Sequence, residues 1–293
     1  MIRFILSSPV VKNSLNSCTD ICKMISFPNC KINLGLSITG KLPSGYHTLE
    51  TVMYPVPLCD VLEVLPSASG YNEFTFSGIQ LPGAEEENLC FKAWKLLAEA
   101  YNIGPVRLHL HKIIPAGAGL GGGSADAAFT LKALNQLFRL RLSDIELEAL
   151  AVKLGMDCPF FITNRPSLAT GRGEITEPIN LNLSGLYLVI VKPEVHISTA
   201  EAYSGVTPKV KDLHPGDIIH KPIAGWLKVL MNDFEESVFT RHPEIDLIKQ
   251  QLLDAGALYA AMSGSGSAVY GIFRQQAEIK DLFSACFVWQ GQL

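Results

Sequence analysis

The chain has 293 residues, of which 48% are hydrophobic and 18% charged, and its formal net charge is −4 at pH 7. A chain of this size can bury a sizeable core in one large or two ordinary domains. The acidic balance without a basic run argues against a nucleic-acid partner, and no stretch reaches the roughly eighteen apolar residues of a membrane span. We therefore expect a globular protein that binds small molecules.

Residues 1 to 23 differ in character from the rest. Arg3 precedes a short apolar run that breaks at Ser7-Ser8-Pro9, well short of the core of an export signal. Met24 stands directly before a strand-like segment, so one hypothesis is that translation begins there. A natural peptide spanning residues 12 to 23 would exclude that hypothesis.

Cysteine and histidine spacing gives no sign of a metal site or a disulfide framework. The seven cysteines form no Cys-x-x-Cys pair, which favours reduced thiols in a cytoplasm. His109 and His111 can share one strand face, but no third ligand is evident, so we expect a solvent-facing pair.

The first strand-like segment after Met24 carries two polar residues on one side. Apolar residues alternate with Lys31 and Asn33, so a strand here places both on its polar face. A cation and an amide then lie side by side. Taken alone, such a pair is typical of a solvated strand face.

The stretch from Pro115 to Ser124 carries the strongest signal. It reads Pro-Ala-Gly-Ala-Gly-Leu-Gly-Gly-Gly-Ser, and its glycines allow backbone N–H groups to approach a ligand closely. Alternation over 106–110 predicts a strand before it, and helical spacing over 128–138 predicts a helix after it with Ser124 as N-cap. Because a helix start offers unpaired N–H groups and partial positive charge, we predict a phosphate site.

Three other interpretations of this stretch compete with a phosphate site. The letters from Gly117 to Gly122 fit a dinucleotide motif, but Ser143 and Glu146 form a capping box where that motif needs a strand ending in an acid. A Walker loop is excluded because no Gly-Lys-Ser/Thr follows. A purely structural turn is disfavoured because so many glycines cost much chain entropy.

Asp157 is the candidate reactive carboxylate. The helix opened by Ser143 should end near Gly155, which leaves Asp157 in a tight bend before Pro159 and two phenylalanines. A carboxylate beside such an apolar corner needs a partner, and Lys31 is the natural one. The alternative is an ordinary turn aspartate.

The remainder of the chain has an α+β pattern. We expect a strand at 160–162, a domain boundary within 164–186, and a strand buried on both faces at 186–191. Helices are expected at about 221–231 and 244–255, and a strand at 268–273.

The pattern Pro-x-x-x-Gly-Leu-Gly-Gly-Gly-Ser-Ala resembles the phosphate-binding motif of the GHMP kinase superfamily (galacto-, homoserine, mevalonate and phosphomevalonate kinases). Over residues 25 to 273 the chain resembles the branch that phosphorylates 4-diphosphocytidyl-2-C-methyl-D-erythritol in non-mevalonate isoprenoid synthesis. The motifs that carry this second resemblance are Lys31-x-Asn33-Leu, Gly45-Tyr-His-Thr-Leu49, Glu87-Asn-Leu89, Leu154-Gly-Met-Asp-Cys-Pro159, Gly171-Arg-Gly-Glu174, Asn232-Asp-Phe-Glu235 and Met262-Ser-Gly-Ser-Gly-Ser267.

The resemblance implies an α+β, two-domain GHMP kinase fold. Its N-terminal domain, ribosomal protein S5 domain 2-like, would span 24–165, and a ferredoxin-like C-terminal domain would span 166–293. Residues 1–23 would be an extension, either untranslated or disordered. The resemblance further implies transfer of phosphate from ATP, with Mg²⁺, to the 2-hydroxyl of the cytidine diphosphate-linked polyol, by a cytoplasmic monomer or weak dimer.

The resemblance also assigns residues to roles. Asp157 would take the proton of the acceptor hydroxyl, and Lys31 would orient Asp157. The residues implied for ATP phosphates are Pro115, Gly117, Gly119, Leu120, Gly121, Gly122, Gly123, Ser124 and Ala125. Those implied for the acceptor substrate are Asn33, Tyr46, His47, Tyr203, Ser263, Gly264, Ser265 and Gly266. Tyr46 and Tyr203 would stack on the cytosine, and His47 would bond its edge.

Some roles stay open. Metal ligands are unknown, with Ser124 and Asp126 as candidates only, and the adenine is expected near Asn88-Leu89 and Lys112. A homoserine or mevalonate type of GHMP kinase is an alternative, although those branches do not require Gly45-Tyr46-His47. A non-catalytic nucleotide-binding regulator is another, but binding alone needs neither the lysine nor the aspartate of the expected pair.

Overall fold

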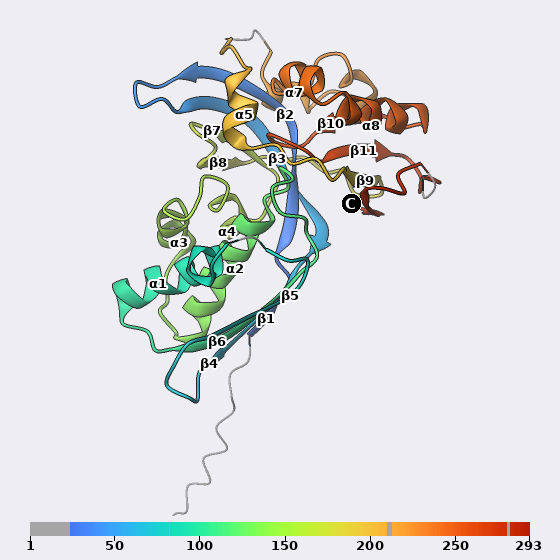
Figure 1. Cartoon of the computed structure of the whole chain (residues 1–293). Helices are drawn as coiled ribbons and strands as arrows, with labels where there is room; N and C mark the ends of the chain where they lie inside the picture. The colour runs from blue at the N-terminus through green and yellow to red at the C-terminus, as the bar shows by residue number, and fades with distance from the viewer. Residues whose placement is uncertain (1–23, 82, 210–212, 280–281) are drawn as a thin grey trace, which may run out of the picture.

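The computed structural model describes residues 24–81, 83–209, 213–279 and 282–293, so the expectations for residues 1–23 lie outside it. Its strands form three four-stranded sheets. The first has the order β1-β4-β6-β5, with only β5 and β6 parallel, and two helices pack on one of its faces (Figure 1). These elements are β1 (Met24–Ser26), β4 (Val61–Pro66), β5 (Glu73–Gly78), β6 (Val106–Lys112), α1 (Leu89–Tyr101) and α2 (Gly122–Leu137).

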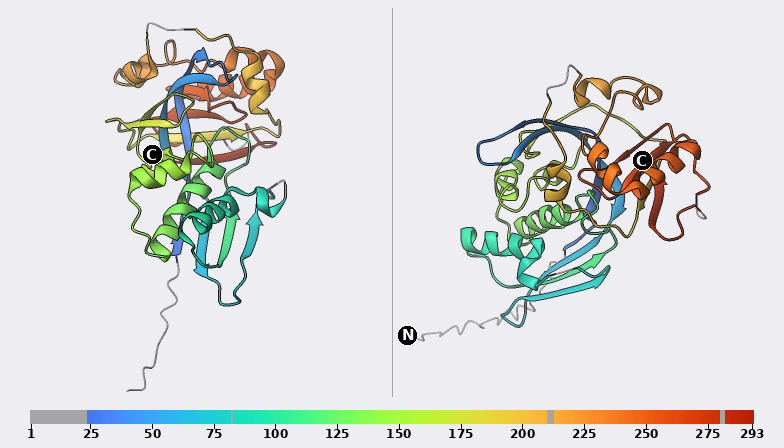
Figure 2. Two further views of the ribbon diagram at one scale, coloured as in Figure 1. Left: turned by 90° about the vertical axis from the view of Figure 1, so that its left-hand side faces the viewer. Right: turned by 45° about the horizontal axis from the view of Figure 1, so that its top comes forward.

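The second sheet is built on a long hairpin that connects the two halves of the molecule. Strands β2 (Asn29–Lys41) and β3 (His47–Cys59) pair antiparallel and run from the N-terminal half into the C-terminal half (Figures 1 and 2). Strands β7 (Ser167–Thr170) and β8 (Ile175–Pro178) extend this sheet in the order β2-β3-β7-β8. The first two strands after the expected boundary at residue 165 therefore belong to the sheet of the hairpin, with β7 paired to β3 and β8 paired to β7.

The third sheet belongs to the C-terminal half. Its order is β10-β11-β9-β12, which is 2-3-1-4 along the chain and ferredoxin-like, with all neighbours antiparallel. One face packs against the hairpin, and the other packs against two helices. These elements are β9 (Tyr187–Lys192), β10 (Tyr259–Met262), β11 (Val269–Phe273), β12 (Phe287–Gln292), α7 (Glu235–Arg241) and α8 (Pro243–Asp254).

Short helical segments complete the described chain. They are the 3₁₀ turns η1 (Glu85–Glu87) and η2 (Ile223–Gly225) and the helices α3 (Asp144–Ala151), α4 (Phe160–Thr163), α5 (Thr199–Ser204) and α6 (Pro215–Ile218). Among the residues described, no helix combines the length and apolar character needed to cross a bilayer.

Several sequence expectations are confirmed. The fold is α+β, and Ser143 caps α3 by accepting from Glu146 N while the Glu146 carboxylate accepts from Ser143 N at 2.8 Å. Strand β9 is buried on both faces, because Leu188 and Ile190 face the hairpin while Val189 and Val191 face the helices. The helix expected at 244–255 is α8, and the strand expected at 268–273 is β11.

Three local expectations are wrong. Residues 160–162 form a helix rather than a strand, since Pro159 has a helical φ of −57° and the two phenylalanines pack among α2 and α3. The segment 221–231 contains only a 3₁₀ turn, because Pro222 and Gly225 interrupt a regular helix. Helix α2 begins at Gly122 with Gly121 as its cap at φ 71°, so Ser124 lies inside its first turn.

Candidate active site

The glycine loop that precedes α2 is fixed from two sides. Its Leu120 carbonyl accepts from the backbone N–H of Lys31 at 2.9 Å, which ties it to β2. The Gly119 carbonyl accepts from Ser263 Oγ at 2.9 Å, which ties it to the C-terminal half. Gly119 has φ +77°, and a Cβ added there would lie 1.9 Å from the carbonyl oxygen of Ser263. Only glycine allows this close approach.

A hollow lies along this loop and the start of α2, and we call it the phosphate hollow. The predicted residues that line it are Pro115, Gly117, Gly119, Leu120, Gly121, Gly122, Gly123 and Ser124. Ala125 does not line it, because its N–H donates to the Gly121 carbonyl at 2.9 Å and its side chain is buried in the core. The C-terminal half contributes Gly266 and His196. The first N–H groups of a helix lack intrahelical partners, so this hollow suits an anion.

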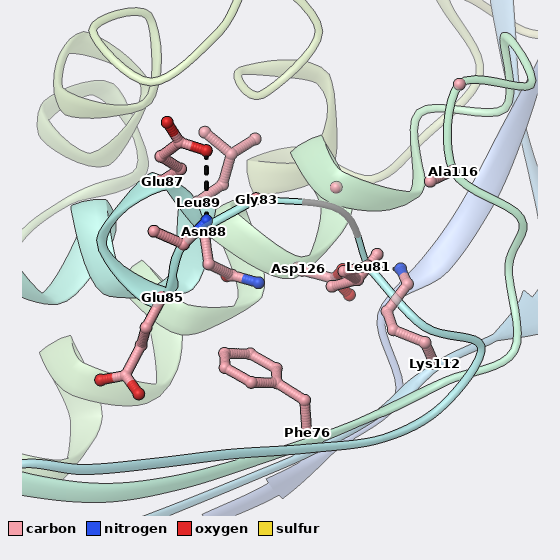
Figure 3. Close-up of a pocket in the computed structure, with 13 residues that line it drawn as sticks. Phe76, Leu81, Gly83, Glu85, Glu87, Asn88, Leu89, Lys112, Ala116 and Asp126 are labelled. Atoms are coloured by element: carbon pink, nitrogen blue, oxygen red, sulfur yellow. Dashed lines mark hydrogen bonds and ion pairs between the residues drawn. The ribbon is translucent and has the colours of Figure 1, made fainter.

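A second hollow, the nucleotide hollow, opens between β5, the start of α1 and the glycine loop (Figure 3). Phe76, Leu81 and Leu89 give it apolar walls. Asn88 caps α1 by accepting from Cys90 N at 2.8 Å, and its amide nitrogen points into the hollow in Figure 3. An apolar slot with one polar amide suits a purine base.

One ammonium is shared by two buried carboxylates on the floor of the nucleotide hollow. Lys112 donates to Asp126 Oδ2 at 2.7 Å and also to Asp60 Oδ2. Asp60 Oδ1 accepts two backbone N–H groups, whereas Asp126 Oδ1 is buried without a hydrogen-bond partner among the described residues. Burial raises the pKa of Asp126, although Lys112 opposes this, and Asp60 raises it further. As expected from the sequence, Lys112 lines this hollow.

The third hollow, the acceptor cleft, has a volume of about 480 Å³ and holds the expected ion pair. Lys31 Nζ lies 3.4 Å from Asp157 Oδ2, which confirms the pairing predicted from the sequence. The same ammonium donates to Asn33 Oδ1 at 2.5 Å and to the Gly119 carbonyl at 2.8 Å. Lys31 and Asn33 share a strand face as expected, but both are buried rather than solvated. Asp157 keeps 34% of its side chain exposed, so a ligand can reach it.

Aromatic rings gather in the acceptor cleft away from this pair. His47 stacks on Tyr203 with ring centroids 4.8 Å apart, and Phe234 meets Tyr203 edge-on. Tyr46 is 59% exposed on the turn between β2 and β3. Burial and the nearby Lys41 lower the pKa of His47, so its imidazole stays neutral at neutral pH. Through its stacking, His47 covers one face of the Tyr203 ring.

The three hollows are continuous. Ala116, Gly117 and Gly123 line both the nucleotide hollow and the phosphate hollow. Ser124 and Asp157 line both the phosphate hollow and the acceptor cleft. Asp157 therefore lies at the junction of the phosphate hollow and the acceptor cleft.

Comparison with known proteins agrees with this arrangement. Residues 88–165 match the model for the GHMP kinases N terminal domain, and residues 220–287 match that for the GHMP kinases C terminal. A 4-diphosphocytidyl-2-C-methyl-D-erythritol kinase of Parabacteroides distasonis is 52% identical over 92% of this chain and 100% of its own length. The corresponding kinase of Cytophaga hutchinsonii is 50% identical over 87% of this chain and 94% of its own. This chain belongs to the 4-diphosphocytidyl-2-C-methyl-D-erythritol kinase family.

Comparison with solved structures shows that other kinases share the fold of this chain. A crystal structure of 4-(cytidine 5'-diphospho)-2C-methyl-D-erythritol kinase superposes with a TM-score of 0.78 at 34% identity, covering 92% of this chain and 98% of that one. The Methanococcus jannaschii mevalonate kinase has a TM-score of 0.67 at 16% identity, covering 92% and 98%, and shows the shared fold alone.

The predicted acceptor residues at 263–266 do not all line the acceptor cleft. Gly264 and Ser265 do, while Ser263 is buried beneath it and holds the glycine loop. Gly266 lines the phosphate hollow instead. Sequence reasoning gave no role to Asn232, whose amide donates to the carbonyls of Met262 and Gly264, both at 2.8 Å. The only indication of Asn232 in the sequence is that it begins one of the motifs that carry the family resemblance. Arg172 in the cleft and His196 in the phosphate hollow were also missed.

Proposed function

We propose that this kinase transfers the γ-phosphoryl group of ATP to the 2-hydroxyl of 4-diphosphocytidyl-2-C-methyl-D-erythritol. The observation that carries the proposal is the position of Asp157, paired with Lys31, at the junction of the phosphate hollow and the acceptor cleft. A chain that only bound a nucleotide would need neither charge at that point.

Asp157 is the proposed base. In phosphoryl transfer the protein mainly positions the reactants and stabilises charge on the transferred group. Asp157 Oδ takes the proton of the acceptor hydroxyl, which makes that oxygen a better nucleophile toward the γ-phosphorus. Lys31 is held by Asn33 and the Gly119 carbonyl, so its ammonium fixes the carboxylate and offsets negative charge as it develops.

The donor nucleotide uses the other two hollows. We propose that adenine lies against Phe76 and Leu89, with its phosphates along the glycine loop and the start of α2. Mg²⁺ usually binds one or two carboxylates together with substrate phosphates. The Ser124 hydroxyl and Asp126 Oδ1, which has no hydrogen-bond partner among the described residues, would hold the ion, and the ion would neutralise phosphate charge there.

The aromatic end of the cleft is the proposed cytosine site. The exposed ring of Tyr46 offers a stacking face, and the neutral imidazole of His47 can both donate and accept, as a base with an amino group and a carbonyl requires. Tyr203 stays uncharged, since burial and Asp157 raise its pKa to about 12. The proposal also includes domains at 24–165 and 166–293 and a monomer or weak dimer in the cytoplasm.

The test measures ADP release from ATP and Mg²⁺ with three acceptors offered separately: the cytidyl substrate, mevalonate and homoserine. We expect turnover with the cytidyl substrate alone, with the phosphate on its 2-hydroxyl by NMR. Turnover with mevalonate or homoserine instead would assign a different acceptor to the cleft. ATP binding without acceptor-dependent ADP release would identify a regulator on the same fold.

A further inference from the structure

The turn between β7 and β8 brings an arginine into the acceptor cleft. Arg172 stands between Gly171 at φ +70° and Gly173 at φ +112°. The turn is closed by Gly173 N donating to the Thr170 carbonyl at 3.0 Å, and it is tied to β3 by Leu49 N donating to the Gly171 carbonyl at 2.8 Å. Arg172 therefore projects from a rigid position beside the cleft that it lines.

The Arg172 side chain is held at one edge and free at the other. Glu174 accepts from the backbone N–H of Arg172 at 2.6 Å and from its Nε at 2.9 Å. The terminal Nη atoms make no hydrogen bond or ion pair within the described part of the chain. The ion pair with Glu174 is partly exposed, so it contributes little to the stability of the hairpin. It uses one edge of the guanidinium and leaves the terminal Nη atoms for a ligand.

Arg172 also contacts the proposed base site. Its Cζ lies 5.5 Å from the centroid of the Tyr46 ring, within the range of a cation–π contact. The next residue, Gly173, is close to the reacting end, since a Cβ added there would lie 3.8 Å from Asp157 Oδ1. The turn thus spans the distance between the aromatic group and the carboxylate. In a nucleoside diphosphate-linked alcohol, the diphosphate lies between the nucleoside, which would bind at the aromatic group, and the alcohol, which would lie at Asp157.

The charges of the cleft favour Arg172 as the side chain that binds an anionic part of the acceptor. Its lining includes two cationic side chains, Lys31 and Arg172. Lys31 already donates to Asn33 and Gly119 and pairs with Asp157, whereas Arg172 keeps its terminal donors. A planar guanidinium presents paired N–H groups that match phosphate oxygens.

We propose that Arg172 binds the diphosphate of the acceptor through its Nη atoms while its guanidinium rests on Tyr46. It is a specificity-determining residue for nucleoside diphosphate-linked acceptors, and this inference rests on the proposed function of the cleft. With 33% of the side chain exposed, solvent screens the contact, and we expect it to strengthen diphosphate binding about tenfold.

The experiment compares cytidine with CDP by isothermal titration calorimetry, with a non-hydrolysable ATP analogue and Mg²⁺ saturating the donor site. The variants are Arg172→Ala, Arg172→Lys and the matched control Arg165→Ala, whose exposed side chain precedes the same β7 strand outside the cleft. We expect Arg172→Ala to lose about tenfold in CDP affinity while cytidine affinity stays unchanged, and Arg172→Lys to lose less. Arg165→Ala should match wild type for both ligands.

Three other outcomes of the calorimetry would overturn the inference. Unchanged affinity of Arg172→Ala for both CDP and cytidine shows that the arginine does not contact the diphosphate. An equal loss for both ligands shows that it only supports Tyr46. If wild type binds neither ligand, the cleft does not take a cytidine diphosphate. Acceptor turnover is measured separately, so wild type could fail as a kinase for this acceptor while the binding comparison still decides the role of Arg172.

Discussion

Replacing Lys112 by Met should destabilise the fold strongly, because it leaves two buried carboxylates without their cation. Lys112 and Asp60 are 2% and 0% exposed, and the Asp126 side chain is 4% exposed. Asp60 would keep two backbone N–H groups, but Asp126 would lose its ammonium partner. Breaking a buried ion pair by removing one partner costs about 3–5 kcal/mol. For a chain of this size that corresponds to a fall in Tm of about 5–8 °C.

The assay is thermal and urea unfolding followed by circular dichroism at pH 7.5. Lys95→Met is the matched control, because Lys95 is 62% exposed and pairs with Glu99 on α1 at 4.0 Å, so its loss should cost less than about 1 kcal/mol. Asp126→Asn keeps the bond from Lys112 to Asp60 and removes the excess negative charge, so it should stay within about 1–2 kcal/mol of wild type. A Lys112→Met protein as stable as the control would refute the reasoning.

Three further predictions concern the catalytic region. Asp157→Asn should lower kcat by about 10²- to 10⁴-fold with ATP affinity by calorimetry unchanged; near-normal turnover would exclude Asp157 as the base. Gly119→Ala should destabilise the protein by about 1–3 kcal/mol in urea, more than Gly185→Ala, which shares a positive φ but has open space; equal losses would contradict the steric argument. Burial raises the pKa of Cys158 to about 12, so iodoacetamide at pH 8 should label it only after unfolding, as peptide mass spectrometry would show.

Features set by local chemistry were predictable from the sequence. The capping box at Ser143 forms within four residues, and the glycine loop is recognisable from its composition. The continuous apolar run at 186–191 indicated a strand buried on both faces, and β9 is such a strand. In each case the physical cause lies within the segment, so neighbours in space do not alter it.

Segments whose structure depends on packing were not predictable in this way. The two phenylalanines at 160–161 suit a strand by propensity, but they pack into the core beside α2 and α3 from a helical turn. Ser124 is a favourable cap by type, yet Gly121 can take the positive φ that starts α2 one turn earlier. Propensity describes the residue, whereas these outcomes were decided by the space available around it.

The candidate site shows the same division between the expected ion pair and the residues that position the elements around it. Lys31 and Asp157 were predictable as a pair, because a carboxylate beside an apolar corner needs a partner and the family resemblance brings Lys31 to it. Asn232 was not, because its role is to hold the carbonyls of Met262 and Gly264, thirty and more residues away in the chain. That bond also fixes the neighbouring Ser263, which in turn holds Gly119 against the acceptor cleft. The glycine loop is thus shaped from the C-terminal half, and only the folded chain reveals that dependence.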